Sequence, residues 1–178
     1  MKTLRPDYVK TAIKVMSKSP IMEYINNSDW KKLDEEIKGG KYGLAINGII
    51  WSSIYQIIGP KLFTDLGYVP AGCFAYVDFT DKPIDIFELP EGVERIDDCA
   101  FYLANLDGIT LTIPKSVKQI ANRGLAMNKD KNLYLEYPGT EKEWRSIKKD
   151  PAYLRKYVDV KAVLLYLIPD NKYLTLKS

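Results

Sequence analysis

The feature that most constrains the fold is a repeat in the middle of the chain. When residues 87–111 are aligned with residues 111–135 at an offset of 24, most apolar positions of the first copy meet an apolar residue in the second, as Val93 meets Val117 and Ile96 meets Ile120. A degenerate earlier copy precedes them at an offset of 27, where Phe74 matches Phe101. A fixed period in the twenties is typical of stacked supersecondary units that hide each other's apolar faces. The sequence therefore predicts a solenoid of about three coils.

One copy of the repeat can be interpreted as one coil of such a solenoid. Leu111 and Ile113 alternate with Thr110 and Thr112, which predicts a strand with the apolar pair inward and the threonines outward. Pro114 ends that strand, because proline has no N–H to donate to a neighbouring strand. Only an adjacent coil can cover the apolar face, so we expect each coil to be stabilised by its neighbours.

The motif of these copies resembles that of the BspA-like leucine-rich repeats, which run as a strand, Ile-Pro, Val, Ile and Ala-Phe. The matching residues are Leu89-Pro90, Val93, Ile96 and Ala100-Phe101, then Ile113-Pro114, Val117, Ile120 and Gly124-Leu125. Arrays of that family often finish with a Tyr-x-Gly-Thr and Glu-Trp element, found here as Tyr137 to Thr140 and Glu143-Trp144. The resemblance covers about residues 66–168 and implies a leucine-rich-repeat architecture. Members of the family bind varied partners, so it implies no particular one.

Residues 1–62 lie outside the repeat and predict a unit of helices and a β-hairpin. Two amphipathic stripes indicate two helices, the second of which begins near Ser28; the stripes are Val9, Ile13 and Met16, then Trp30, Leu33 and Ile37. Asn47-Gly48 favours a two-residue type I′ turn, so we expect a hairpin formed by residues 42–46 and 49–55.

The C-terminal residues 140–178 predict a cap on the last coil. Thr140 and Glu143 have the spacing of a capping box, and Val160 to Ile168 is a β-branched and leucine-rich run typical of a strand. The expected fold is thus α+β: a short leucine-rich-repeat solenoid of about three coils (63–139), an N-terminal helix and hairpin unit (1–62), and a C-terminal helix and strand cap.

The composition excludes several kinds of catalytic and metal site. The chain has no histidine, which excludes Ser-His-Asp and Cys-His catalysis and histidine-ligated metals. Two cysteines, Cys73 and Cys99, cannot build a four-thiolate zinc site, and their places in the repeat favour burial. The adjacent acids Asp97 and Asp98 point to opposite sides of extended backbone. We therefore expect no catalytic residue, cofactor or metal and a function that is not enzymatic; a carboxylate-based enzyme site assembled from distant coils is the second alternative.

The apolar runs of the chain favour a cytoplasmic protein. The N-terminal residues have no apolar stretch of secretory length, and the longest apolar runs are far shorter than the ~20 residues of a membrane-spanning helix. We expect no contact with a membrane and two free thiols.

Charge is divided unevenly along the chain. Residues 41–110 carry 10 acidic and 4 basic side chains, whereas residues 111–178 carry 14 basic and 7 acidic ones. Basic residues interleaved with tyrosines in the C-terminal third make nucleic-acid or other polyanion binding the first alternative function. The residues concerned are Lys115, Lys118, Arg123, Lys129, Lys131, Arg145, Lys148, Lys149, Arg155 and Lys156, with Tyr134, Tyr137, Tyr153 and Tyr157.

The preferred function is protein binding through the sheet face of the solenoid or through the N-terminal unit. Outward positions of successive strands form columns, and a rigid surface of mixed apolar and charged side chains suits recognition of an unidentified protein partner. Tyr134 is the strongest single candidate, because aromatic residues dominate the energetics of interfaces. The predicted partner-binding residues are Ile86, Glu88, Arg95, Thr110, Thr112, Gln119, Tyr134 and Glu136.

Overall fold

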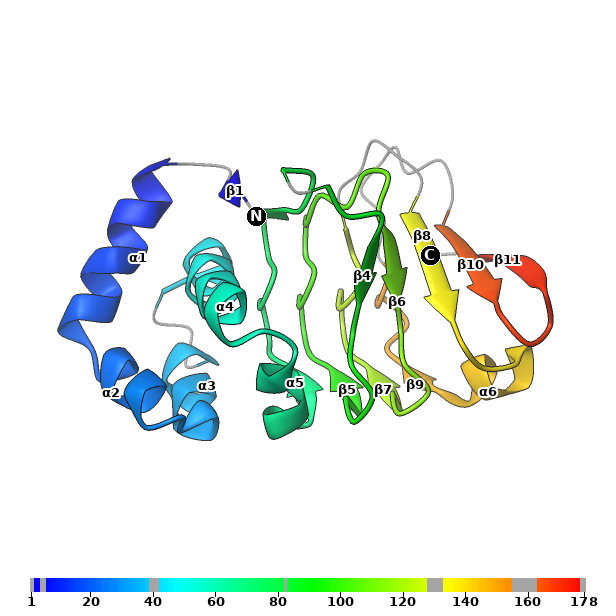
Figure 1. Ribbon diagram of the computed structural model, residues 1–178, viewed down its shortest axis with the longest axis horizontal. Helices are drawn as coiled ribbons and strands as arrows, with labels where there is room; N and C mark the ends of the chain where they lie inside the picture. The colour runs from blue at the N-terminus through cyan, green and yellow to red at the C-terminus, as the bar shows by residue number, and fades with distance from the viewer. Residues whose placement is uncertain are drawn as a thin grey trace.

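The repeat builds a β-solenoid of roughly three turns, with helices at its N-terminal end (Figure 1). The structure is a computed structural model, and it describes residues 2–3, 6–38, 42–81, 83–127, 133–154 and 163–176. Each new coil lies beside the previous one, and the molecule is therefore elongated along the direction in which the coils stack (Figure 1).

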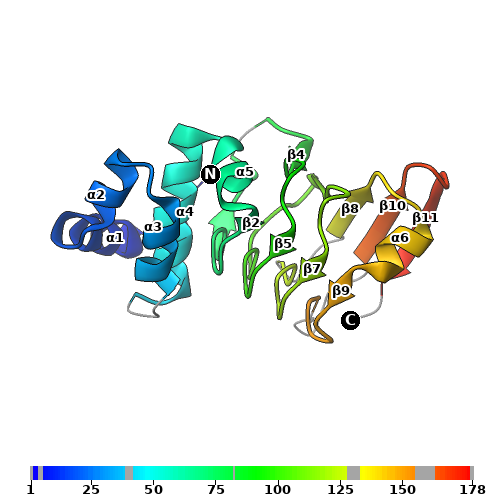
Figure 2. The same ribbon diagram turned by 90° about the horizontal axis from the view of Figure 1, so that it is seen from below.

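Two sheets form two sides of the solenoid. The five-stranded sheet has the order β11-β10-β8-β6-β4, with β4 at Ile86–Glu88, β6 at Thr110–Thr112, β8 at Leu133–Tyr137, β10 at Val163–Leu167 and β11 at Lys172–Leu176. The four-stranded sheet has the order β2-β5-β7-β9, with β2 at Tyr68–Val69, β5 at Arg95–Ile96, β7 at Gln119–Ile120 and β9 at Lys148–Lys149 (Figure 2). Within these two sheets all pairs are parallel except β10 with β11.

The strand register confirms the offsets predicted from the sequence. Leu111 pairs with Phe87 on one side and with Leu135 on the other, each 24 residues away. In the other sheet Ile96 pairs with Val69 at an offset of 27 and with Ile120 at an offset of 24. One repeat of the sequence is therefore one coil of the solenoid.

A ladder of turns forms a further side of each coil. The backbone N–H of Cys99 donates to the carbonyl of Asn122 at 2.9 Å, and that of Arg123 donates to the carbonyl of Ala152 at 3.1 Å. Gly72, Cys99 and Arg123 occupy the same position in successive coils, and all three have a positive φ of 67°, 56° and 55°. The repeat thus includes a left-handed residue in each coil, although two of these residues are not glycine.

Aromatic rings fill the first coils. Phe74 lies 5.1 Å from Phe101, centroid to centroid, and 5.4 Å from Phe87. Tyr55 of the helical part contacts Phe74 and lies 5.1 Å from Phe63. One hydrophobic cluster therefore runs from the helices into the solenoid, and it continues to Leu167 near the C-terminus.

The N-terminal helices are α1 (Pro6–Lys18), α2 (Ile21–Asn26), α3 (Trp30–Lys38), α4 (Leu44–Ile58) and α5 (Lys61–Leu66). The stripe of α3 is buried as predicted. In α1, however, Ala12 is buried and Ile13 is 63% exposed, so the predicted apolar face is wrong at Ile13. Asp29, not Ser28, accepts the N–H of Lys32 at the start of α3, and Ser28 adopts a positive φ of 54°.

The predicted hairpin over residues 42–55 is wrong, because these residues belong to α4. Asn47 and Gly48 lie inside this helix and are buried with their neighbours. A Cβ on Gly48 would lie 2.1 Å from the carbonyl oxygen of Ala75, so the glycine allows the helix to approach the first coil. A helix that is apolar on nearly all sides is stable only when it is enclosed by the protein, as α4 is here.

The C-terminal cap follows the sequence prediction more closely. The short helix α6 (Glu141–Ser146) begins with a capping box, in which Thr140 and Glu143 bind each other's backbone N–H groups. Trp144 is buried against Tyr137, with ring centroids 5.3 Å apart. The predicted strand at 160–168 is β10, and β11 adds a hairpin strand at the edge of the sheet. A short N-terminal strand, β1 (Lys2–Thr3), pairs with β3 (Val77–Asp78).

Candidate binding surface

The outer face of the five-stranded sheet carries two rows of side chains that run across the strands. The register places Ile86, Thr110 and Tyr134 side by side in the first row. The second row is parallel to it and contains Glu88, Thr112 and Glu136. These are the two columns that the sequence predicts from the repeat offset.

The strands β10 and β11 extend both rows beyond the predicted residues. Leu164 lies beside Tyr134, and Tyr166 lies between Glu136 and Tyr173. The rings of Tyr166 and Tyr173 are 4.9 Å apart, and the Tyr166 hydroxyl donates to Oδ1 of Asn171 at 2.8 Å. Leu164 and Tyr166 belong to the leucine-rich run that predicts a strand, so their positions could be found from the sequence, whereas the hairpin strand β11 copies no earlier segment.

Exposure on this face is unequal. Ile86 is 55% exposed, Tyr134 37% and Tyr173 65%. Thr112 occupies an outward position but is only 8% exposed, because its short side chain lies in a row between the longer Glu88 and Glu136. Thr112 therefore offers little surface to a partner, whereas Ile86 and Tyr134 in the first row offer much more.

The charge on the face is acidic. The carboxylates of Glu88 and Glu136 make no hydrogen bond or ion pair with any residue of the described ranges. Neither row contains a lysine or an arginine in β4, β6, β8, β10 or β11. The face thus combines exposed apolar side chains with carboxylates that have no protein counterion in the described part of the chain.

Arg95 and Gln119 lie on the other sheet, so the expectation of one surface for all eight predicted residues is wrong. They pair with each other in β5 and β7, away from the rows of the five-stranded sheet. The Arg95 guanidinium donates to Asp97 and lies over the Tyr68 ring, 4.4 Å from its centroid. The Arg95 side chain is therefore held by contacts within the protein.

These contacts belong to a polar cluster that joins α3 to the first two coils. The Tyr68 hydroxyl donates to Oδ2 of Asp34 at 2.7 Å, and the Lys38 ammonium donates to Oδ2 of Asp97 at 3.4 Å. Asp34 is buried, its Oδ1 has no hydrogen-bond partner in the part of the chain that the structure describes, and burial raises the pKa of its carboxyl. The cluster fixes the helical unit against the solenoid, and sequence reasoning missed it.

The basic C-terminal third does not form an open cationic track in the described residues. Lys115 pairs with Glu143 at 2.8 Å, Lys118 with Glu94 at 2.6 Å, and Arg145 with Glu141 at 2.6 Å. Tyr137 is buried, although it was predicted to stack on bases. Lys129, Lys131, Arg155, Lys156 and Tyr157 lie outside the described residues.

Lys149 occupies an inward position next to Ile120 and closes the stack of coils. Its ammonium donates to the carbonyl of Ile147 at 3.0 Å and to that of Trp144, at the end of α6. Burial lowers its pKa to about 8. An amine held by two carbonyls at the end of a helix serves as a cap rather than as a phosphate contact.

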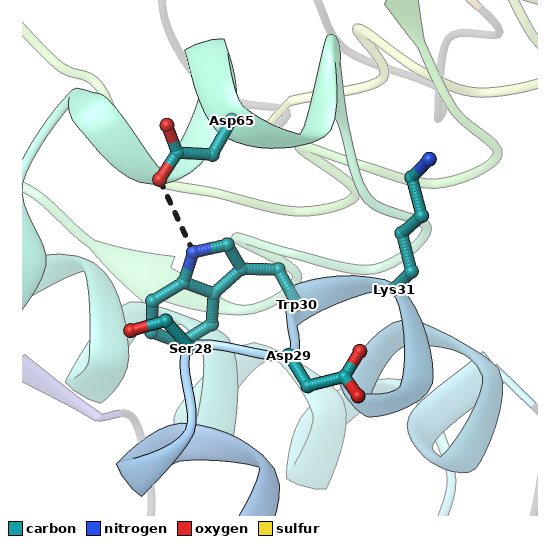
Figure 3. Close-up of a pocket in the computed structure, with 5 residues that line it drawn as sticks. All are labelled: Ser28, Asp29, Trp30, Lys31 and Asp65. Carbon is teal, nitrogen blue, oxygen red and sulfur yellow. Dashed lines mark hydrogen bonds between the residues drawn. The ribbon is translucent and has the colours of Figure 1, made fainter.

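A hollow of about 370 Å³ lies where the turn before α3 meets α5 (Figure 3). The Trp30 indole N–H donates to Oδ2 of Asp65 at 3.3 Å, and the Lys61 ammonium lies 2.6 Å from the same oxygen. The second carboxylate, Asp29, pairs with Lys32 at 2.8 Å. Hydrogen bonds from Lys32 and Lys61 lower the pKa of the Asp29 and Asp65 carboxyls. Each acid of the hollow is therefore ionised and already paired with a lysine of the protein.

The adjacent acids Asp97 and Asp98 and the two thiols make contacts within the protein. Asp97 is buried and bonded to Arg95, while exposed Asp98 accepts the N–H of Asn122 at 3.1 Å. Burial raises the pKa of both thiols, Cys73 and Cys99, which disfavours the nucleophilic thiolate. Among the residues that the structure describes, no three acids or cysteines gather in a way that could hold a metal ion. No helix in those same ranges is both apolar enough and long enough to cross a bilayer.

Comparison of the chain with family models, with curated proteins and with solved structures finds no match. The leucine-rich-repeat membership that the motifs suggest therefore stays a prediction, and the function has to be argued from the surface itself.

Proposed function

We propose that this chain is a non-enzymatic protein-binding module whose recognition surface is the outer face of the five-stranded sheet. The observation that carries the proposal is the pair of rows in which exposed Ile86, Tyr134 and Tyr173 accompany Glu88 and Glu136, whose carboxylates pair with no residue that the structure describes. Aromatic and large apolar side chains on a rigid support dominate binding energy in protein interfaces. Little side-chain ordering is needed on binding, because the sheet holds the rows in place.

The sheet face is a better candidate than the N-terminal unit. The exposed apolar residues of that unit, Ile13, Met22 and Ile57, lie on three different helices. Those of the sheet are aligned by strand register. The free thiols Cys73 and Cys99 support the cytoplasm as the proposed compartment, because disulfides are rare there.

Site-specific photo-crosslinking tests the proposal. A photoreactive amino acid at Tyr134 should give a discrete protein adduct in cell extract, and excess unlabelled protein should compete it away. The matched control places the same group at Lys148, which is exposed on the other sheet. Unlabelled protein with Ile86→Ser and Tyr134→Ala should fail to compete. Equal adducts at both positions, or competition by the substituted protein, would contradict the proposal.

A further inference from the structure

The positions of Glu88 and Glu136, whose carboxylates have no counterion among the described residues, restrict the shape of the partner. Glu88 on β4 and Glu136 on β8 are separated by one strand, β6. Neighbouring strands lie about 4.8 Å apart, so the two residues are about 9.6 Å apart along the row. A partner that neutralises both must therefore present two positive charges at that spacing across the strands.

An apolar row runs parallel to the acidic one. Ile86 and Tyr134 precede Glu88 and Glu136 by two residues, which is about 6.6 Å along each strand. Leu164 continues this row on β10. The partner must therefore carry a basic edge and an apolar edge side by side.

An α-helix fits this pattern and an extended strand does not. Residues i and i+7 lie on one side of a helix and are about 10.5 Å apart, close to the separation of the two glutamates. An extended chain repeats its side every second residue, at about 6.6 or 13 Å, and misses that separation. A helix parallel to the strands would cover only one glutamate, because each lies on a different strand.

We infer that the sheet face binds a basic amphipathic helix of a partner protein, oriented across the strands. The inference rests on the proposed function and adds the chemistry of the partner. Lysine or arginine at i and i+7 pairs with Glu88 and Glu136, and apolar residues on the adjoining side of the helix, at i+1 and i+8, pack on Ile86 and Tyr134. Five strands span about 19 Å, which corresponds to a helix of about 13 residues.

The first test uses defined probes. A helical peptide with lysine at i and i+7 and leucine at i+1 and i+8 should bind, and its binding should weaken as salt increases. Glu88→Gln and Glu136→Gln should each weaken binding about twofold to fivefold, as expected for an exposed ion pair. The matched control is Glu23→Gln with Glu35→Gln, which removes two exposed charges from the helical unit. A peptide with glutamate in place of both lysines should not bind.

The second test separates this inference from the proposed function. The partner segment crosslinked to position 134 is identified by mass spectrometry, and the inference predicts a helix with basic residues seven apart. An acidic or extended segment would overturn the inference but leave protein binding intact. A crosslink to a second copy of this chain would also overturn it. Equal peptide binding by the wild type and the Glu88→Gln/Glu136→Gln protein would do the same, whereas absence of any adduct would count against the proposed function itself.

Discussion

A single buried carboxyl, Asp34, makes the junction between the helices and the solenoid sensitive to pH. Its Oδ2 accepts a hydrogen bond from the Tyr68 hydroxyl, while its Oδ1 has no hydrogen-bond partner among the described residues. The nearby charged groups are Lys38, Arg95 and Asp97. Burial raises the pKa above the 3.8 of an exposed aspartate, because desolvation outweighs the Tyr68 hydrogen bond and the attraction of Lys38. The ionised carboxylate is therefore destabilising in the folded protein.

The sign of the pH effect follows from this pKa. Above pH 3.8 the Asp34 carboxyl loses its proton in the unfolded chain but keeps it in the folded protein. The stabilising contribution of Asp34 therefore falls as the pH rises from 3.8 through the raised pKa of the folded state. We predict that the free energy of unfolding of Asp34→Asn, compared with that of wild type at the same pH, increases as the pH rises from about 3 to about 7. Urea unfolding across that range measures it. Glu35→Gln, an exposed neighbour on α3, is the control. Parallel pH profiles for Asp34→Asn and wild type would contradict the prediction.

Gly48 shows how closely a helix and a coil approach each other. Alanine is ordinarily favoured over glycine inside a helix by about 1 kcal/mol. Here its Cβ would meet the Ala75 carbonyl oxygen at 2.1 Å, so overpacking outweighs helix propensity. We predict that Gly48→Ala lowers the free energy of unfolding by about 2 kcal/mol. Ser53→Ala on the same helix should cost less, because it loses only a hydrogen bond to the Ile49 carbonyl. A neutral or stabilising Gly48→Ala would show that α4 does not contact the coil in this way.

Among the elements, α4 shows where local sequence signals fail. Asn47-Gly48 is a strong turn signal, and the flanking isoleucines and tyrosines have high β propensity. Burial on nearly every side of the helix overrides both preferences, and that burial depends on Ala75 and the aromatic rings of later coils. Within the repeat, by contrast, local alternation and the tertiary contact carry the same information, so strands β4, β6 and β8 were predictable. The hairpin strand β11 repeats nothing and was missed.

The capping box of α6 is an element that could be predicted from four residues. Thr140 accepts the Glu143 N–H at 3.3 Å, and the Glu143 carboxylate accepts the Thr140 N–H at 2.7 Å. We predict that Thr140→Ala lowers the free energy of unfolding by about 1 kcal/mol. Chemical denaturation measures this, with exposed Lys142→Ala in the same helix as the control. A loss equal to that of the control would mean that the box contributes nothing to the cap.

At the scale of the whole molecule, one core spans the helices and the coils. Tyr55 and Phe63 of the helical part meet Phe74 and, through it, Phe101 of the next coil. The Asp34–Tyr68 contact adds a polar connection across 34 residues of sequence. No period in the sequence encodes such contacts, which is why the two outer rows could be predicted but the junction could not. The residues of the two outer rows were correctly placed in register. That Arg95 and Gln119 lie on another sheet could not be predicted, because it depends on the path of the whole coil.

A continuous core predicts one cooperative transition. Trp30 and Trp51 are buried in the helical part and Trp144 in the C-terminal cap. In a protein that retains only Trp51, and in one that retains only Trp144, with phenylalanine at the other two positions, the urea midpoint measured by fluorescence should equal the midpoint of the same protein measured by far-UV circular dichroism. Far-UV circular dichroism of both proteins in the absence of urea controls for folding. Two separated midpoints would mean that the helices and the solenoid unfold independently.

The central claim is that each coil lies on the next at the offset of the repeat. Nuclear magnetic resonance detects it directly through scalar couplings across hydrogen bonds in deuterated protein. The stacking predicts couplings from the amide nitrogen of Ile113 to the carbonyl of Glu136 and from that of Phe101 to the carbonyl of Gly124, bonds of 2.9 and 3.0 Å. If these amides are protected from exchange but couple to carbonyls at another offset, the coils do not stack as described.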